Sequence, residues 1–200
     1  VGGYALCQTP PFPELWSRNP GHADFLFFRL GLGERPFPGK IEIPKERFSL
    51  HPDALAGQPE RIRQKYESLQ VVPVGLNLRE HGLVGLVGGE GKQGAYEVAR
   101  EILIQAAYGC SYTEVKLVLL YDASNPDEKA MFSLFRWLPH TWSGDGRLRF
   151  VAEKAEEVSE VACALERVLR VRVERIKSGS YDKEPRPYYL VFVSDRRLLK

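Results

Sequence analysis

The chain has 200 residues, of which 44% are hydrophobic, and its 28 basic and 26 acidic side chains leave a formal charge of +2 at pH 7. This balance excludes the strongly basic surface of a dedicated nucleic-acid binder, and the three widely spaced cysteines form neither a disulfide framework nor a metal-binding pattern. The longest apolar runs are far shorter than the ~20 residues of a membrane helix, so we expect a soluble piece with one core, in a reducing compartment.

The first third of the chain is rich in proline, which interrupts regular structure: nine of the 14 prolines lie within the first 59 residues. Short strands are predicted at residues 25–30 and 40–43, and apolar spacing predicts a helix over residues 59–70. We expect an N-terminal arm or linker over residues 1–20, followed by a β-rich extension over residues 21–72 that packs on the core.

From residue 73 to residue 200, short apolar runs alternate with longer amphipathic ones. This alternation is typical of crossover units and a mostly parallel sheet. The predicted strands are Val74–Leu78, Leu83–Val87, Val115–Tyr121, Leu148–Val151 and Tyr188–Val193. The sequence therefore predicts an α/β fold with three layers, in which helices cover both faces of the sheet.

Three helices are predicted between these strands. Apolar residues recur at helical spacing from Ala95 to Ala106 and again from Val158 to Ile176. A third helix should begin at Asn125-Pro126, because asparagine caps a helix and proline suits its first turn. The acidic residues that follow, Asp127 and Glu128, would face the positive end of this helix.

A glycine-rich loop follows the predicted strand at residues 83–87, and it resembles a phosphate-binding P-loop. In such a loop, glycines let backbone N–H groups surround the phosphates, a lysine neutralises charge, and a hydroxyl binds magnesium. Gly91 and Lys92 match the middle of the motif. However, five residues rather than four separate Gly85 from Gly91, and Gln93 stands where the hydroxyl belongs.

Two other interpretations of this loop remain open. Gly89, Gly91 and Gly94 also match the fingerprint of a dinucleotide site, although the acid expected to bind the ribose, Asp122, lies farther along the chain than this motif requires. Alternatively, the glycines only form the tight turn between a strand and a helix, with Lys92 in solvent.

A second candidate position follows the last predicted strand. Asp195 comes directly after the apolar run, where P-loop proteins place the carboxylate that holds magnesium. The next residue, Arg196, stands where many such proteins place an acid that polarises water, and a guanidinium cannot accept that proton. Together with Gln93, it makes hydrolysis at this position unexpected.

Five segments, in this order, resemble the cytosolic region of the membrane-anchored FtsK/SpoIIIE-type ATPases of type VII (Ess/ESX) secretion. They are Leu15–Arg18, Asp24–Gly33, Gly85–Gly88, Gly109–Val118 and Arg136–His140. The best match is the degenerate module that precedes the tandem ATPase domains, and it covers almost the whole chain. A fragment also agrees with a sequence that begins at Val1 and has its only methionine at Met131.

The resemblance implies a P-loop NTPase (RecA-like) fold with a small irregular N-terminal extension, in which residues 73–200 form a degenerate, C-terminally truncated domain. It implies a cytoplasmic domain of a protein anchored in the bacterial cell membrane. The expected partners are the adjacent ATPase domains of the same parent chain and the type VII secretion machinery, with a hexamer in the parent. That motor would export small helical-hairpin substrates.

The resemblance also implies a nucleotide site at Gly89, Gly91, Lys92, Gln93 and Asp195. Lys92 would take the position of the phosphate lysine and Asp195 that of the magnesium carboxylate, so ATP with Mg is the cofactor that these residues would hold. No catalytic residue and no separate metal site is predicted. The expected function is a non-catalytic pseudo-ATPase module that couples or regulates the motor; the alternative is an active ATPase domain or ATP-dependent DNA translocase.

Two further clusters have plain structural interpretations. Basic residues crowd the region from Arg167 to Lys177, but Glu166 and Glu174 are interleaved with them, and cations near the end of a helix are favourable without any partner. We therefore do not expect this fragment to contact DNA. The segment Trp137–His140 should end a helix and turn the chain, with Trp137 and Leu138 buried and Pro139 stopping the helix. The nearby Trp142 leaves an exposed aromatic patch for a partner domain as an alternative.

Overall fold

The computed structural model describes residues 14–43, 55, 57–89, 91–179 and 186–199. Its helices and strands are β1 (Phe27–Pro36), α2 (Gln58–Tyr66), β2 (Ser68–Asn77), α3 (Gln93–Gly109), β3 (Val115–Leu120), α4 (Pro126–Phe132), β4 (Val151–Ala152), α5 (Ala155–Lys177) and β5 (Tyr188–Val193). Three short 3₁₀ helices, η2 (Ser133–Trp137), η3 (Pro139–Thr141) and η4 (Arg196–Leu199), complete the described elements. The chain divides into two compact units, one of residues 1–28 and 77–200 and the other of residues 29–76.

The larger unit is built on a parallel sheet with the strand order β4-β3-β5. The pairing of β3 with β5 runs from Val115 opposite Tyr188 to Leu120 opposite Val193, and β4 lies on the other side of β3. All six residues of β3 are buried. A strand that is buried throughout and apolar except for Lys116 is typical of a parallel strand covered on both faces, so the predicted parallel sheet and mixed α/β fold are confirmed.

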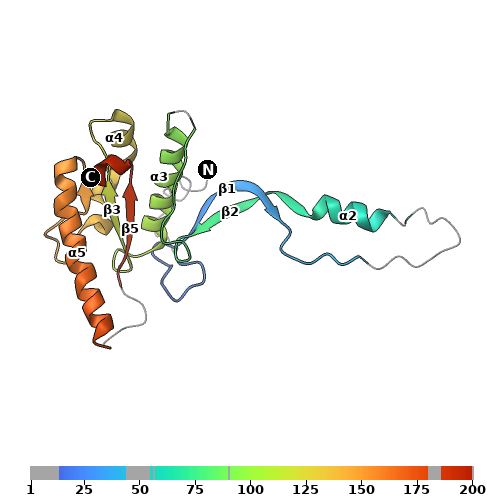
Figure 1. The fold of residues 1–200 in the computed structure, drawn as a ribbon, viewed down its shortest axis with the longest axis horizontal. Helices are drawn as coiled ribbons and strands as arrows, with labels where there is room; N and C mark the ends of the chain where they lie inside the picture. The colour runs from blue at the N-terminus through green and yellow to red at the C-terminus, as the bar shows by residue number, and fades with distance from the viewer. Residues whose placement is uncertain (1–13, 44–54, 56, 90, 180–185, 200) are drawn as a thin grey trace. The chain divides into compact units, whose positions relative to one another are not determined.

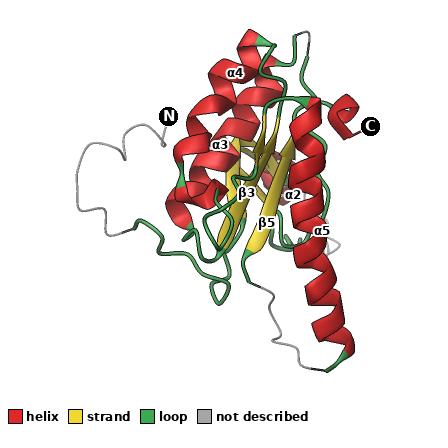
Figure 2. Cartoon of the chain, turned by 90° about the vertical axis from the view of Figure 1, so that its left-hand side faces the viewer, coloured by secondary structure: helices red, strands yellow, loops and turns green. Residues whose placement is uncertain are grey.

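Helices cover the two faces of this sheet, with α3 and α4 on one side and α5 on the other (Figures 1 and 2). Side chains of β3 alternate between the two faces. Val115, Leu117 and Leu119 belong to the core cluster that includes α3, and Val118 and Leu120 belong to the one that includes α5. The start of α4 is as predicted, because the side-chain oxygen of Asn125 accepts a hydrogen bond from the N–H of Asp127 at 3.0 Å.

Two of the predicted strands differ from the structure in this unit. Residues 83–87 form no strand, and Leu83 and Val87 are each 96% exposed. Glycines at 82, 85 and 88 interrupt the apolar run, which weakens strand formation and leaves few side chains to pack.

The strand predicted at Leu148–Val151 is also mostly wrong, since β4 begins only at Val151. The residues before it pair with the preceding segment in a tight hairpin: Phe150 donates its N–H to the carbonyl of Thr141, and Ser143 donates to that of Leu148. The carbonyl of Phe150 still accepts from the N–H of Leu119 in β3 at 2.9 Å, but the hairpin takes the N–H of Phe150 and the carbonyl of Leu148, which a longer β4 would have offered to β3.

The smaller unit contains β1, β2 and α2. β1 and β2 form a two-stranded sheet, and α2 has no buried residue. The helix predicted over residues 59–70 ends at Tyr66, and Leu69 belongs to β2; the strand predicted at 25–30 begins two residues later, at Phe27, and runs to Pro36. The strand predicted at residues 40–43 is not formed. Strand pairing outweighs local apolar spacing here.

The N-terminal segment of the larger unit is held at the end of α3. The N–H groups of Trp16 and Arg18 donate to the carbonyls of Tyr108 and Gly109, both at 2.8 Å, and the indole N–H of Trp16 donates to that of Ala107 at 3.1 Å. These donors satisfy carbonyls that the last turn of a helix leaves without partners. The segment thereby closes the carboxyl end of α3.

His140 lies against this closure and is fully buried. Its Nε2 is 2.8 Å from the carbonyl oxygen of Cys110, and its ring packs edge-on against Trp16 and Tyr112. Nδ1 is buried and has no partner among the described residues. Burial therefore lowers the pKa of His140, the charge of Lys116 lowers it further, and the hydrogen bond to Cys110 offsets part of that change.

We expect the free energy of unfolding to fall as the pH decreases below about 6.5, because the unfolded state then binds a proton that the folded state refuses. At pH 5.5, one unit below the ordinary pKa of histidine, His140 should lower the free energy of unfolding by at most about 1.4 kcal/mol. Urea unfolding at pH 7.5 and 5.5 measures it. His140→Gln should remove this part of the pH dependence, whereas His81→Gln, at an exposed histidine, should keep it. Equal pH dependence in His140→Gln and the wild type would contradict the assignment.

Candidate functional site

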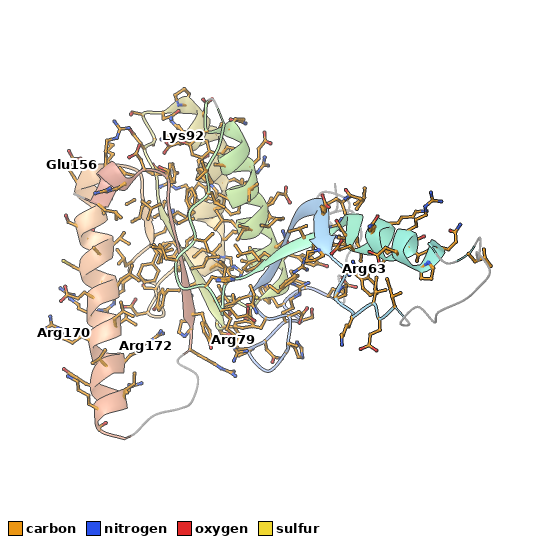
Figure 3. The ribbon with its side chains drawn as sticks, turned by 45° about the vertical axis from the view of Figure 1, so that its right-hand side comes forward. Arg63, Arg79, Lys92, Glu156, Arg170 and Arg172 are labelled. Carbon is orange, nitrogen blue, oxygen red and sulfur yellow. The ribbon has the colours of Figure 1, made fainter. Side chains whose placement is uncertain are left out.

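The predicted site residues meet at the carboxyl-terminal edge of the parallel sheet. β5 ends at Val193 and is followed by Asp195, and β3 ends at Leu120 and is followed by Asp122. The N-terminus of α3 brings Lys92 to the same edge. Figure 3 shows Lys92 at the end where α5 begins near Glu156, away from Arg170 and Arg172.

The glycine loop folds onto itself as it enters α3. Lys92 is the N-cap of α3 and has a left-handed backbone, with φ of 58°, and Gly91 has φ of 89°. The N–H of Lys92 donates to the carbonyl of Gly89 at 3.4 Å, and its own carbonyl accepts from Tyr96 at 3.1 Å. At Gly88, an added Cβ would lie 2.9 Å from the Cα of Lys92. Gly88 is therefore required for the close approach of the two backbones, a role that the P-loop motif did not indicate.

Lys92 and Asp195 bind each other. Nζ of Lys92 is 3.2 Å from Oδ2 of Asp195, so the two positions that the sequence predicted separately form one ion pair. Arg197 binds the same carboxylate: its Nε is 3.1 Å from Oδ1, its Nη2 is 2.9 Å from Oδ2, and its backbone N–H donates to Oδ1 at 2.9 Å. The hydrogen bonds from Arg197, followed by the one from Lys92, hold the pKa of Asp195 well below its usual range.

This arrangement does not fit a magnesium ion. Magnesium needs oxygen ligands in near-octahedral geometry, and both oxygens of Asp195 are already occupied by cationic donors. The amide nitrogen of Gln93 donates to Glu97 at 3.2 Å along the surface of α3. Among the residues that the structure describes, no group of three histidine, cysteine, aspartate or glutamate side chains could hold a metal ion.

Arg197, rather than its neighbour Arg196, is the arginine that belongs to the site. Both lie in η4, and Arg196 is exposed. Arg196 attracted attention in the sequence because it stands where an acid is expected, whereas Arg197 was not predicted to take part. A sequence signal did exist, because an aspartate often accepts a hydrogen bond from the backbone two residues later, and this turn places Arg197 over its carboxylate.

The dinucleotide interpretation has little support in the geometry. The carboxylate of Asp122 accepts hydrogen bonds from the N–H and the hydroxyl of Ser124, at 2.9 and 2.6 Å, within its own turn. These bonds lower the pKa of Asp122. Both bonds end on Oδ1 and hold the carboxylate in its own turn.

A buried carboxylate, Glu128, joins the elements around the site and was not recognised from sequence. Only 3% of Glu128 is exposed, and it accepts hydrogen bonds from the hydroxyl of Tyr96 at 2.7 Å, from the N–H of Asp122 at 2.9 Å and from the hydroxyl of Ser194. Burial, followed by the hydrogen bond to Glu128, raises the pKa of Tyr96. Glu128 thus connects α3, α4 and the ends of β3 and β5. The sequence indicated only a first-turn acid at this position.

Comparison with known proteins gives one distant similarity. No family model matches the chain. Over 190 residues, 94% of its length, the chain is 20% identical to the type VII secretion system protein EssC of Staphylococcus aureus strain MSSA476, and it is equally similar to that of strain NCTC 8325 / PS 47. It spans only 12% of the length of these relatives. The similarity supports a role related to type VII secretion.

None of the described helices combines the length and the apolar character that a membrane crossing requires.

Proposed function

We propose that the chain is a non-catalytic pseudo-ATPase module of an FtsK/SpoIIIE-type motor for type VII secretion. Three kinds of support converge on this proposal: the distant similarity to EssC over nearly the whole chain, the parallel sheet between helices, and the meeting of a glycine-lysine loop with a carboxylate at the sheet edge. The fold of the larger unit would then be a degenerate P-loop NTPase fold.

The observation that carries the proposal is the state of the Asp195 carboxylate. An active P-loop site needs this carboxylate for magnesium and the lysine for phosphate. Here each group neutralises the other at 3.2 Å, and Arg197 adds two side-chain hydrogen bonds to the same carboxylate. The Lys92 side chain is 55% exposed and a phosphate could still contact it, but magnesium would have to compete with both Lys92 and Arg197 for the Asp195 carboxylate.

A non-catalytic module of this kind would act through its contacts. We propose that it lies in the cytoplasmic part of a membrane-anchored parent and couples or regulates adjacent ATPase domains within a hexameric assembly. DNA contact is not part of the proposal, because basic side chains of α5 are engaged within the fold. Arg170 pairs with Glu166 at 2.7 Å, and Arg172 donates to the carbonyl of Pro187 at 2.6 Å and stacks on Tyr189.

We expect the 200-residue chain to release no phosphate from ATP with magnesium above the background of its Lys92→Ala variant, because Asp195 cannot supply a magnesium site. Phosphate release over several hours measures this. Calorimetry should in addition show that magnesium does not strengthen the binding of ATP, since a nucleotide held by Lys92 alone would not need the metal.

Two outcomes would contradict the proposal. One is ATP turnover that is lost in both Lys92→Ala and Asp195→Asn, which would show an active site. The other is binding of ATP that is tenfold or more tighter with magnesium than with EDTA, which would show that Asp195 serves the metal. Binding of NAD in the same calorimeter would instead favour the dinucleotide interpretation. Lys154→Ala removes another exposed lysine and is the matched control for Lys92→Ala.

A further inference from the structure

A short hairpin on the larger unit holds an arginine in a fixed position, far in sequence from the glycine loop. Its two sides, around Trp142 and Arg149, are opposite each other in an antiparallel bridge. The turn between them is closed by hydrogen bonds from Gly146 to the carbonyl of Ser143 at 3.0 Å and from the hydroxyl of Ser143 to Asp145 at 2.6 Å. Gly146 has φ of 68°, which favours glycine, so the turn is locally specified.

The guanidinium of Arg149 packs against two tryptophan rings. Its Cζ is 4.3 Å from the ring centroid of Trp142 and 5.4 Å from that of Trp137. Within the described part of the chain, this guanidinium has no hydrogen-bond or ion-pair partner, and its Nε is buried. A guanidinium held by aromatic rings keeps its planar donors in a fixed orientation, which suits a carboxylate.

The other arginines nearby are paired. Arg136 binds Glu153 at 2.9 Å, and Arg147 lies 3.9 Å from Asp145. Of these three arginines, Arg149 alone lacks an acidic partner among the described residues. The local charge is therefore suited to one added negative charge rather than to a polyanion.

Exposed apolar groups lie beside this arginine. Trp137 and Leu134, three residues apart in η2, are each 71% exposed, so the predicted burial of Trp137 is wrong. Arg136 also stacks on Trp137, with its Cζ 5.8 Å from the ring centroid. The following turn is fixed because Thr141, which is fully buried, donates its hydroxyl hydrogen to the carbonyl of Leu138 at 2.9 Å. Tryptophan and arginine on a preorganised surface are the residues that dominate protein interfaces.

We propose that Leu134, Trp137, Trp142 and Arg149, here named the tryptophan–arginine surface, bind an acidic segment of a partner protein. One carboxylate of that segment accepts hydrogen bonds from the Nη groups of Arg149, and a neighbouring apolar side chain packs on Trp137 and Leu134. A nucleic-acid strand is the less suitable ligand, because its successive phosphates would meet Glu153 and Asp145 beside the single unpaired arginine. The site involves none of the residues around Lys92 and is independent of nucleotide binding.

The test is a selection from a phage-displayed library of random twelve-residue peptides on the folded 200-residue chain, with Arg149→Gln as the counter-selection. We expect enriched peptides to carry an aspartate or glutamate within a few positions of an aromatic or aliphatic residue. Synthesised peptides should bind Arg149→Gln about ten- to a hundredfold more weakly than the wild type, the range for loss of a charged hydrogen-bonded contact. Fluorescence anisotropy of the labelled peptides measures the affinities.

Two further variants test whether peptide binding depends on the tryptophan–arginine surface. Arg147→Gln removes the same charge from the same hairpin and should change the affinity less than threefold, because Arg147 is highly exposed and already has an acidic neighbour. Trp137→Ala removes an exposed ring and should also weaken binding about tenfold or more. If Arg149→Gln fails to fold, by circular dichroism, Trp137→Ala decides the question.

Three outcomes would overturn the proposal. The first is a library that yields no peptide dependent on Trp137 or Arg149. The second is an enriched set without acidic residues. The third is a labelled twelve-residue oligothymidine that binds the wild type more tightly than the selected peptides do and is released by Arg149→Gln, which would assign the surface to single-stranded nucleic acid.

Discussion

Replacing Glu128 with alanine should lower the free energy of unfolding by about 3 kcal/mol or more. The change removes the acceptor of the buried Tyr96 hydroxyl and of three part-buried donors, the N–H of Asp122, the side-chain amide of Asn125 and the hydroxyl of Ser194. An unsatisfied buried donor costs about 1 to 3 kcal/mol, and the part-buried donors add to this cost. Urea unfolding followed by circular dichroism measures the difference.

The neighbouring acid provides the control for this prediction. Asp127 also lies in the first turn of α4 but is exposed, and Asp127→Ala should cost no more than about 1 kcal/mol through the helix dipole. Tyr96→Phe, which removes one donor together with its need for an acceptor, should cost much less than Glu128→Ala. If the free energies of unfolding of the Glu128→Ala and Asp127→Ala variants differ by less than about 1 kcal/mol, Glu128 does not connect the four elements as described.

Replacing Phe132 with alanine should destabilise the larger unit by about 3 to 5 kcal/mol, the usual range for removal of a buried aromatic ring. Phe132 is fully buried at the end of α4. Its ring centroid is 4.5 Å from that of Phe192 in β5, 5.8 Å from that of Tyr96 in α3 and 5.9 Å from that of Tyr121 after β3. The cavity left by alanine cannot close without moving several elements, and the same unfolding experiment detects it.

Leu134→Ala is the matched change for this comparison. It removes a large apolar side chain two residues farther along, but that side chain is exposed, so the free energy of unfolding should change by no more than about 0.5 kcal/mol. A Phe132→Ala variant that was as stable as Leu134→Ala would show that the ring does not hold α4 against the sheet.

Features set by local sequence were predictable. The start of α4 was predicted from Asn125 and Pro126, because a cap depends only on its own turn. β3 and β5 were predicted almost to the residue from runs that are apolar except for Lys116. The stretch at residues 83–87 has a similar apolar character but contains one glycine and lies between two others, and its residues alone do not show whether a neighbouring strand pairs with it.

The location of the candidate site was predictable from the sequence, but the contacts among its side chains were not. A lysine before one helix and an aspartate after one strand were expected at the same edge of a parallel sheet, and Lys92 and Asp195 do lie there. That they bind each other depends on side-chain geometry across more than half of the chain, and so does the role of Glu128, whose partners come from three separate elements. Residue spacing carries no information on such contacts.

The strand order has a consequence for synthesis of the protein on the ribosome. β3 is buried along its whole length in the folded protein. One of its edges is covered by β5, which is synthesised long after β3. Until β5 leaves the ribosome, β3, which is apolar except for Lys116, retains an unpaired edge, which is the feature that promotes association between chains. Pairing over such a separation is also slow, because a long loop must close first. We therefore expect the pairing of β5 with β3 to be a late step in folding, and the interval before it is when a chaperone would bind β3.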